Sequence, residues 1–224
     1  MGKNKNNNKV KIKKAIVSVY DKNGLEEFIK NLVRIIPEIV IYSTGGTYAN
    51  IEKYLIKGPI NLKSISDYTG QPEMQGGLVK TLDFKIYLGL LSETYNEDHN
   101  KDLHRAGADT IDLVVTNLYP FDKVIAGTDV NIEKARGNID IGGPCMLRAA
   151  AKNFIRVASI CDPKDYRPLI EELEKSNGSI SFNTRYKLAK KAFKHTADYD
   201  KTVSGYLDSI SDDDAIKTYN LINN

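Results

Sequence analysis

Short apolar runs alternate with amphipathic segments along the first two thirds of the chain. Five runs have the length and the β-branched content of strands: KAIVSVY (14–20), EIVIYS (38–43), INLKSIS (60–66), IDLVVTNLY (111–119) and RVASIC (156–161). LEEFIKNLVRII (25–36) repeats apolar residues at helical spacing, and a second helix is expected from TGGT to about Leu55. This alternation predicts an α/β fold, a parallel sheet with helices on its faces.

The last third of the chain is predicted to be mainly helical. Pro144 opens one helix, and Asp162 followed by Pro163 is typical of the cap and first turn of another. A long helical pattern then runs from about Phe182 to Leu207. By contrast, residues 67–83 lack periodicity and are rich in glycine, which is typical of a functional or mobile loop.

Charge is concentrated at the N-terminus. The net charge is +3, yet residues 1–14 hold six lysines and no acid, so the rest of the chain carries −3. A segment this polar cannot bury itself, and a solvated leader is favoured over a nucleic-acid-binding arm. We therefore predict a disordered basic tail over 1–13, one domain over 14–210 and a C-terminal tail over 211–224.

Composition favours a cytoplasmic globular protein. The 224 residues are 41% apolar and 27% charged. No run approaches the roughly 18–20 apolar residues that cross a membrane, and the polar N-terminus is unlike a signal peptide. Cys145 and Cys161 form no zinc-ligand pattern with the histidines, so reduced thiols are expected and no metal site is predicted.

Polar and small residues follow the predicted strands, where an open α/β sheet binds its ligands. STGGT (43–47) joins a strand to a helix, and its glycines let backbone N–H groups approach an anion at the helix start. An ordinary strand-to-helix turn would have a similar sequence. However, Ser18 and Lys22, at the end of the neighbouring predicted strand, add a hydroxyl group and a positive charge. The predicted phosphate-binding residues are Ser18, Lys22, Ser43, Thr44, Gly45, Gly46 and Thr47.

A second small-residue segment, NIDIGGPCMLRAAAKN (138–153), has an acid near its start and a base near its end. Gly142 lets the backbone pass close to a ligand, and the alanines let the following helix pack tightly. Asp140 and Lys152 lie at opposite ends, so only the fold can bring both to one site. The alternative, in which Asp140 caps the helix and Lys152 is solvated, is equally compatible with the spacing.

These segments resemble the IMP cyclohydrolase domain, normally the N-terminal half of the bifunctional AICAR transformylase/IMP cyclohydrolase. The resemblance covers about residues 14–207, and eight motifs in the family's order carry it: SVYDKNG (18–24), STGGT (43–47), SDYTGQPEM (66–74), VKTL (79–82), NLYPF (117–121), NIDIGG (138–143), LRAAAKN (147–153) and KAFKHTADYD (191–200). It implies a methylglyoxal-synthase-like fold with a helical C-terminal extension.

The resemblance implies dehydrative closure of the ribonucleotide FAICAR to IMP, in the last step of de novo purine synthesis, without metal or redox cofactor. It implies four catalytic positions: Lys80, Tyr119, Asp140 and Lys152. It adds further substrate contacts at Thr81, Asn117, Ile141 and Gly142. No nucleic-acid or membrane partner is expected, and a homodimer is suggested by analogy. His195 is expected to make a structural hydrogen bond rather than to act in catalysis.

The departures from the family lie in residues 76–89. Leu78 stands where the family usually has arginine, Asp83-Phe84 replaces His-Pro, and Tyr87 occupies the position of a further histidine. A divergent relative acting on a related ribonucleotide, or a nucleotide-binding module without catalysis, would also fit these changes. The transformylase half does not follow in this sequence, so a separate formyltransferase is the expected source of FAICAR if the chain is complete.

Overall fold

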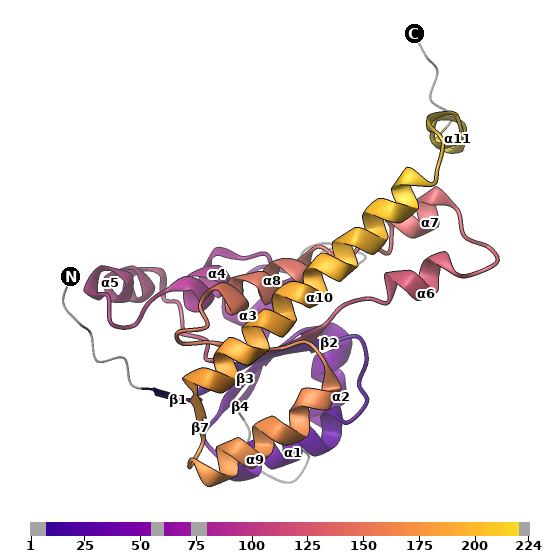
Figure 1. The fold of residues 1–224 in the computed structure, drawn as a ribbon. Helices are drawn as coiled ribbons and strands as arrows, with labels where there is room; N and C mark the ends of the chain where they lie inside the picture. Colours follow the sequence, from indigo (N-terminus) through magenta and orange to yellow (C-terminus); the bar gives the residue numbers. More distant parts are fainter. Residues whose placement is uncertain (1–7, 55–60, 73–79, 220–224) are drawn as a thin grey trace.

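A five-stranded parallel sheet lies at the centre of the molecule (Figure 1). The computed structural model describes residues 8–54, 61–72 and 80–219. The strand order is β4-β3-β2-β5-β6, with β2 at Lys14–Val19, β3 at Val40–Ser43, β4 at Asn61–Ser64, β5 at Leu113–Asn117 and β6 at Ala158–Ile160. All five predicted strands are therefore confirmed, each one to four residues shorter than its apolar run.

The sheet contains a topological switch point beside β2. From β2 the chain moves outward through β3 to β4, and it then returns to the other side of β2 as β5. Val17 pairs with Ser43 on one side of β2, and Val19 pairs with Asn117 on the other, so the carboxyl ends of these strands lie together. Open α/β sheets bind ligands at such a point.

Helices cover both faces of the sheet (Figure 1). One face packs against α1 (Leu25–Ile35), α2 (Gly45–Tyr54) and α9 (Tyr166–Lys175). The other packs against α4 (Phe84–Leu91) and α8 (Gly142–Lys152). Side chains alternate along β2 accordingly: Ala15 and Val17 belong to the first core, and Ile16 belongs to the second. The predicted fold class, an α/β parallel sheet flanked by helices, is confirmed.

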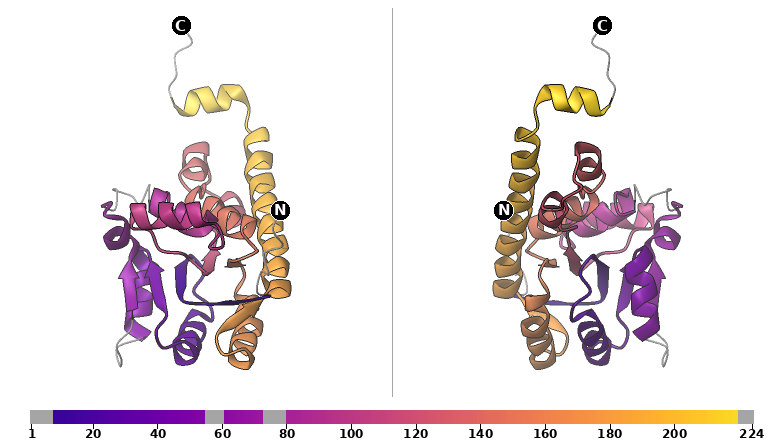
Figure 2. Two further views of the ribbon diagram at one scale, coloured as in Figure 1. Left: turned by 90° about the vertical axis from the view of Figure 1, so that its left-hand side faces the viewer. Right: turned by 90° about the vertical axis from the view of Figure 1, so that its right-hand side faces the viewer.

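The C-terminal extension is one long helix, α10 (Phe182–Asp208). Ser181 caps it by accepting the Thr184 N–H, and Leu188, Ala189 and Ala192 are buried against the domain. Figure 2 shows α10 standing along one side of the molecule and continuing past the sheet. Its distal half lies beside α6 (Phe121–Ile125), because Phe121 meets the rings of Tyr199 and Tyr206 edge-on.

The two predicted tails contain structure. Within the supposed disordered tail, β1 (Lys9–Lys11) pairs antiparallel with β7 (Ser179–Ser181), and Ile12 is fully buried. The strand β1 is too short for an alternation of apolar and polar residues to be recognised, because two of its three residues are lysines on the exposed face. The 211–224 segment includes α11 (Asp212–Thr218), capped by Ser211. The remaining helices, which the sequence pattern did not reveal, are α3 (Ile65–Thr69), α5 (Glu97–Ala106) and α7 (Ile132–Arg136).

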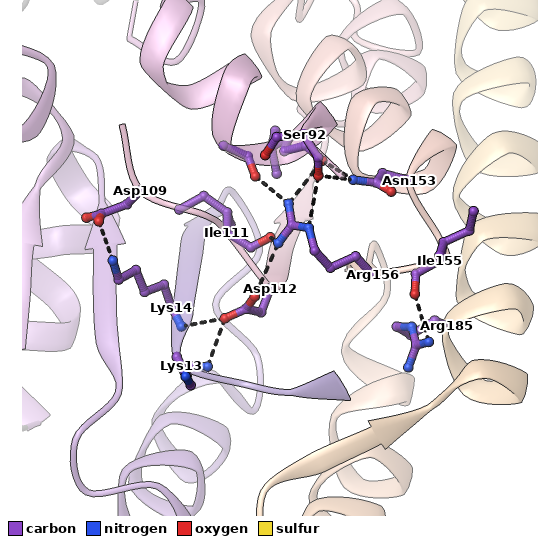
Figure 3. Close-up of polar contacts among 12 residues, drawn as sticks. Lys13, Lys14, Ser92, Asp109, Ile111, Asp112, Asn153, Ile155, Arg156 and Arg185 are labelled. Atoms are coloured by element: carbon purple, nitrogen blue, oxygen red, sulfur yellow. Dashed lines mark hydrogen bonds and ion pairs between the residues drawn. The ribbon is translucent and has the colours of Figure 1, made fainter. Parts of the chain in front are cut away.

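A buried polar network joins α4 to the sheet (Figure 3). The Arg156 side chain, which follows α8, donates to the backbone oxygens of Ser92 at 3.1 Å and Ile111 at 2.8 Å. It also pairs with Asp112 at 3.2 Å, and Asp112 in turn accepts the Lys13 and Lys14 N–H groups. The Arg156 guanidinium group thus donates hydrogen bonds to backbone oxygens that follow α4. These bonds hold the end of α4 close to the start of β5.

In the part of the chain that the structure describes, no helix combines the length and apolar character needed to cross a membrane.

Candidate active site

The turn after β2 is fixed to the end of β5 by an amide side chain. Asn117 accepts the Tyr20 N–H at 2.7 Å and the Asp21 N–H at 2.9 Å, and its own amide donates to the Asp21 oxygen. The Asn117 side chain thus has a structural role, and its expected contact with the substrate stays a prediction. The turn places the Tyr20 ring 5.1 Å from the ring of Tyr119, and both rings are about half exposed at the switch point.

The three hydroxyls of the STGGT segment are all buried, and they differ in their hydrogen-bond partners. Ser43 is fully buried and donates to the Val17 oxygen, and Thr47 donates to the Val19 oxygen at 3.0 Å. These hydroxyls tie β3 and α2 to β2, so the predicted donation from them to a phosphate is replaced by structural bonds. Thr44 instead shares a 2.8 Å hydrogen bond with Ser18 at the rim of the sheet, where either oxygen can donate.

The start of α2 has the geometry of an anion site. Gly45 has a backbone φ of +35°, which residues other than glycine rarely adopt. Gly46 is exposed, and an added Cβ would have no neighbour within 4 Å, so its surroundings are open. The Lys22 ammonium lies in the adjacent turn, 3.3 Å from the Tyr20 oxygen. Unpaired N–H groups and the helix dipole favour a phosphate at such a helix start.

Asp140 lies just before α8, next to the connection that follows β5. Its carboxylate accepts the Gly143 N–H at 2.9 Å, and the backbone N–H of Tyr119 also reaches it. Burial raises the pKa of the Asp140 carboxyl above its ordinary value, and these two hydrogen bonds oppose the shift. A carboxylate with a raised pKa is a stronger base than an exposed aspartate.

The backbone at Gly142 and Gly143 lies close to neighbouring side chains, including the Asp140 carboxylate. A Cβ on Gly143 would lie 2.6 Å from Asp140 Oδ2 and 2.8 Å from Leu118 Cδ2, so any larger residue would displace these side chains. A Cβ on Gly142 would lie 2.9 Å from Thr81 Oγ1. Thr81 and the neighbouring half-buried Lys80 are therefore placed beside the start of α8. The predicted set Lys80, Thr81, Tyr119, Asp140, Ile141 and Gly142 lies in one region.

Lys152 does not join this region within one chain. Asp140 precedes α8, whereas Lys152 is the last residue of the helix and is exposed. Ten residues of helix at 1.5 Å each separate the two ends by about 15 Å, which exceeds the reach of a lysine side chain. Lys152 therefore cannot contact Asp140 within one chain, and its catalytic role stays a prediction.

The structure also changes the account of His195. No hydrogen bond to this side chain is found among the described residues, and the buried Nε2 atom has no partner there. Burial lowers the pKa of the imidazole, which keeps it neutral. The expected structural hydrogen bond is thus not observed.

Three of the four departures from the family now have positions. Asp83 caps α4 by accepting the Lys85 N–H at 2.8 Å, and Phe84 is exposed at the first position of the helix. Tyr87 turns toward α8, where its hydroxyl is buried and burial raises its pKa. Leu78 lies outside the described residues. Asp83 and Tyr87 therefore serve α4 and its packing.

No cluster of three potential metal-ligating side chains (His, Cys, Asp or Glu) occurs in residues 8–54, 61–72 and 80–219.

Tyr199 is a neighbour of the site that the sequence did not identify. Its hydroxyl oxygen accepts the backbone N–H of Asp140 at 2.7 Å. The residue lies within the motif KAFKHTADYD, but helical periodicity could only assign it to a packed face. The signal available in the sequence was its seven-residue spacing to Tyr206, which places both rings on one side of α10.

Comparisons with known proteins agree with this architecture. The family model of the MGS-like domain matches residues 24–145, more than half of the chain. The chain belongs to the MGS-like domain family. A second model, the AICARFT/IMPCHase bienzyme, matches residues 150–223, which include α9, α10 and α11. The family resemblance inferred from the eight motifs is thereby confirmed.

Several curated relatives are named bifunctional purine biosynthesis protein PurH. The chain is 46% identical over 211 residues to the one from Ruminiclostridium cellulolyticum, which covers 94% of this chain and 40% of that protein. It is 49% identical over 195 residues to the one from Thermoanaerobacter sp., covering 87% and 37%. The chain thus spans about two fifths of the length of these relatives.

The crystal structure of a protein named ForH has a similar fold. It superposes with a TM-score of 0.72 at 31% identity, over 86% of this chain and 97% of that one.

Proposed function

We propose that this chain is an IMP cyclohydrolase that converts FAICAR to IMP in the cytoplasm. The observation that carries the proposal is the convergence of Asp140, Tyr119 and the Lys80-Thr81 segment beyond the end of β5, at the switch point of the sheet. Kinship with proteins named PurH and the match to the AICARFT/IMPCHase bienzyme model support the reaction. FAICAR itself has to be supplied by a formyltransferase.

The arrangement suits a ribonucleotide that spans the edge of the sheet. The 5′-phosphate occupies the start of α2, held by the N–H groups of Gly45 and Gly46, by the Ser18–Thr44 hydroxyl pair and by Lys22. The base then lies over the backbone of Ile141 and Gly142, next to Tyr119. This pose places the two reacting groups of one molecule against a fixed carboxylate and an ammonium.

Ring closure requires a base and an oxyanion partner. Asp140 takes a proton from the carboxamide nitrogen as that nitrogen forms a bond to the formyl carbon. The formyl oxygen becomes negative, and Lys80, helped by the Tyr119 hydroxyl, stabilises it and donates a proton. A second proton then lets this oxygen leave as water, and the formamido nitrogen releases its own proton as the C–N double bond of the new ring forms. Each atom of the substrate other than this water stays in IMP.

The positions of the departures support retained chemistry over a changed substrate. Asp83 caps the start of α4, and Tyr87 packs toward α8, so neither directs a new charged group into the region of Lys80 and Asp140. If the chain does not cyclise FAICAR, two alternatives are favoured. The chain then acts on a related ribonucleotide, or it binds a nucleotide without catalysis.

The proposal is tested by absorbance-monitored cyclisation of FAICAR with the purified chain. We expect enzyme-dependent formation of IMP, and a loss of roughly 100- to 10,000-fold in kcat for Lys80→Ala. An exposed lysine, Lys187→Ala on α10, serves as the matched control and should retain full activity. Tight binding of IMP without any conversion of FAICAR would overturn the reaction and favour a binding module.

The separation of Lys152 from Asp140 supports a homodimer. Lys152 and Arg148 lie one turn apart on the exposed face of α8, and the Arg148 guanidinium rests over the ring of Phe193, which is itself exposed. We propose that two copies meet over this face and that Lys152 of one copy serves the site of the other. The lysine then donates the proton that the departing water requires.

Mixing two inactive variants tests this arrangement. Lys152→Ala and Asp140→Asn should each be nearly inactive alone. In a two-fold dimer with exchanged lysines, each mixed dimer keeps one intact site, so equal mixing should restore about a quarter of wild-type activity. Sedimentation should show a dimer throughout. If the mixture stays inactive although mixed dimers form, Lys152 does not act across the interface.

A further inference from the structure

The segment that carries Asp140 is held by a side chain from the C-terminal extension. Asp140 lies in the connection between α7 and α8, outside any regular element. Its backbone N–H donates to the Tyr199 hydroxyl oxygen at 2.7 Å. Among the described residues, no other side chain from beyond α7 and α8 forms a hydrogen bond with the backbone of residues 138–141. The hydroxyl therefore anchors the Asp140 backbone, while the N–H groups of Gly143 and Tyr119 hold its carboxylate.

The Tyr199 ring is itself located by packing. Phe121, which is almost fully buried at the start of α6, meets it with ring centroids 6.3 Å apart and planes at 65°. Phe121 follows the Leu118–Pro120 segment, so the same contact joins α10 to the connection that bears Tyr119. Burial raises the pKa of the Tyr199 phenol, so the group stays neutral. Two of the proposed catalytic segments thus meet one face of α10.

We propose that Tyr199 is a positioning residue for the reaction: its hydroxyl, carried on α10, holds Asp140 at the place where the carboxylate meets the substrate. This inference rests on the proposed function. The proposal assigns a role to the distal half of α10, which extends beyond the sheet, because that half carries the Tyr199 hydroxyl. A shift of about 1 Å at a catalytic group can cost roughly 100-fold in rate, so a single anchoring hydrogen bond is a sensitive point.

Tyr199→Phe removes the hydroxyl and keeps the ring. We expect kcat for FAICAR to fall by about 10- to 100-fold with KM changed by less than about threefold, because the substrate contacts stay in place. We also expect the acidic limb of the kcat profile to move to lower pH, since a freed Asp140 carboxylate gains solvent. Asp200, the charged residue next to Tyr199 on α10, is unchanged in this variant.

Tyr206→Phe is the matched control. Tyr206 lies two turns further along α10 and packs on the same Phe121, with centroids 5.9 Å apart, and its hydroxyl makes no hydrogen bond with the described residues. This variant should keep the wild-type kcat, KM and pH profile. If kcat fell equally in both variants, the effect of Tyr199 would come from ring packing and not from its hydrogen bond, and the proposal would be overturned.

An NMR titration of the Asp140 carboxyl separates this inference from the proposed function. With carboxyl-labelled aspartate, wild type should titrate above the range of an exposed aspartate, and Tyr199→Phe should return toward that range. A wild-type chain that fails to convert FAICAR would sink the proposed function, while the titration would still report on the anchoring bond. An identical Asp140 titration in wild type and Tyr199→Phe would contradict the anchoring role.

Discussion

Asp140→Asn should reduce kcat for FAICAR cyclisation by roughly 100- to 10,000-fold, the range that single general bases contribute. The substitution keeps the size of the side chain and an oxygen for the Gly143 N–H, but an amide cannot take the proton from the attacking nitrogen. KM should change little, because the phosphate is held at the start of α2. Steady-state kinetics at saturating FAICAR measure the effect.

The pH profile provides the second half of this prediction. Burial raises the pKa of Asp140, and only the ionised carboxylate acts as the base. Activity should therefore be lost as pH falls through this raised value, at a pH above the titration of an exposed aspartate. The residual activity of Asp140→Asn should lack this limb. Asp122→Asn, an exposed residue in the first turn of α6, should leave both the rate and the profile unchanged.

Arg156→Leu should lower the free energy of unfolding by about 3–5 kcal/mol, the usual cost of breaking a buried ion pair from one side. Arg156 is 5% exposed, and its loss strands the buried Asp112 carboxylate together with carbonyl groups near the end of α4. Because α4 follows the Lys80–Asp83 segment, FAICAR turnover should also become more sensitive to temperature. Urea unfolding measures the stability change.

Arg167→Leu on α9 is the matched control for that measurement. Arg167 forms an exposed pair with Glu171 one turn away, and its side chain is 90% accessible. Exposed pairs of this kind contribute about 0–1 kcal/mol. If Arg156→Leu cost no more than Arg167→Leu, the network of Figure 3 would not be holding α4 in place.

The elements with strong local patterns could be predicted from the sequence. The strand at 14–20 and the long helix from Phe182 are defined by apolar runs and by caps, and both were found within a few residues of their ends. β1 and β7 were missed because these three-residue strands, unlike β6, do not lie within a longer apolar run. Helix α5 was missed because its mostly polar residues present little of an apolar face.

The candidate site was predictable in membership but not in the use of each side chain. Small residues and hydroxyls at strand ends indicated the edge of the sheet. However, whether Ser43 faces a ligand or the Val17 carbonyl depends on its position opposite the neighbouring strand, which sequence does not specify. The distance between Asp140 and Lys152 depends on α8 being straight and continuous between them. Tyr199 meets Asp140 only through tertiary packing across 59 residues.

The most direct test of the account is a crystal structure of this chain with IMP. We predict that the phosphate lies within hydrogen-bonding distance of the Gly45 and Gly46 N–H groups. The purine ring should lie beside Tyr119 and over the Ile141–Gly142 backbone, with the Asp140 carboxylate at its edge. A nucleotide bound away from the start of α2, or a base that does not approach Asp140, would contradict the proposed site.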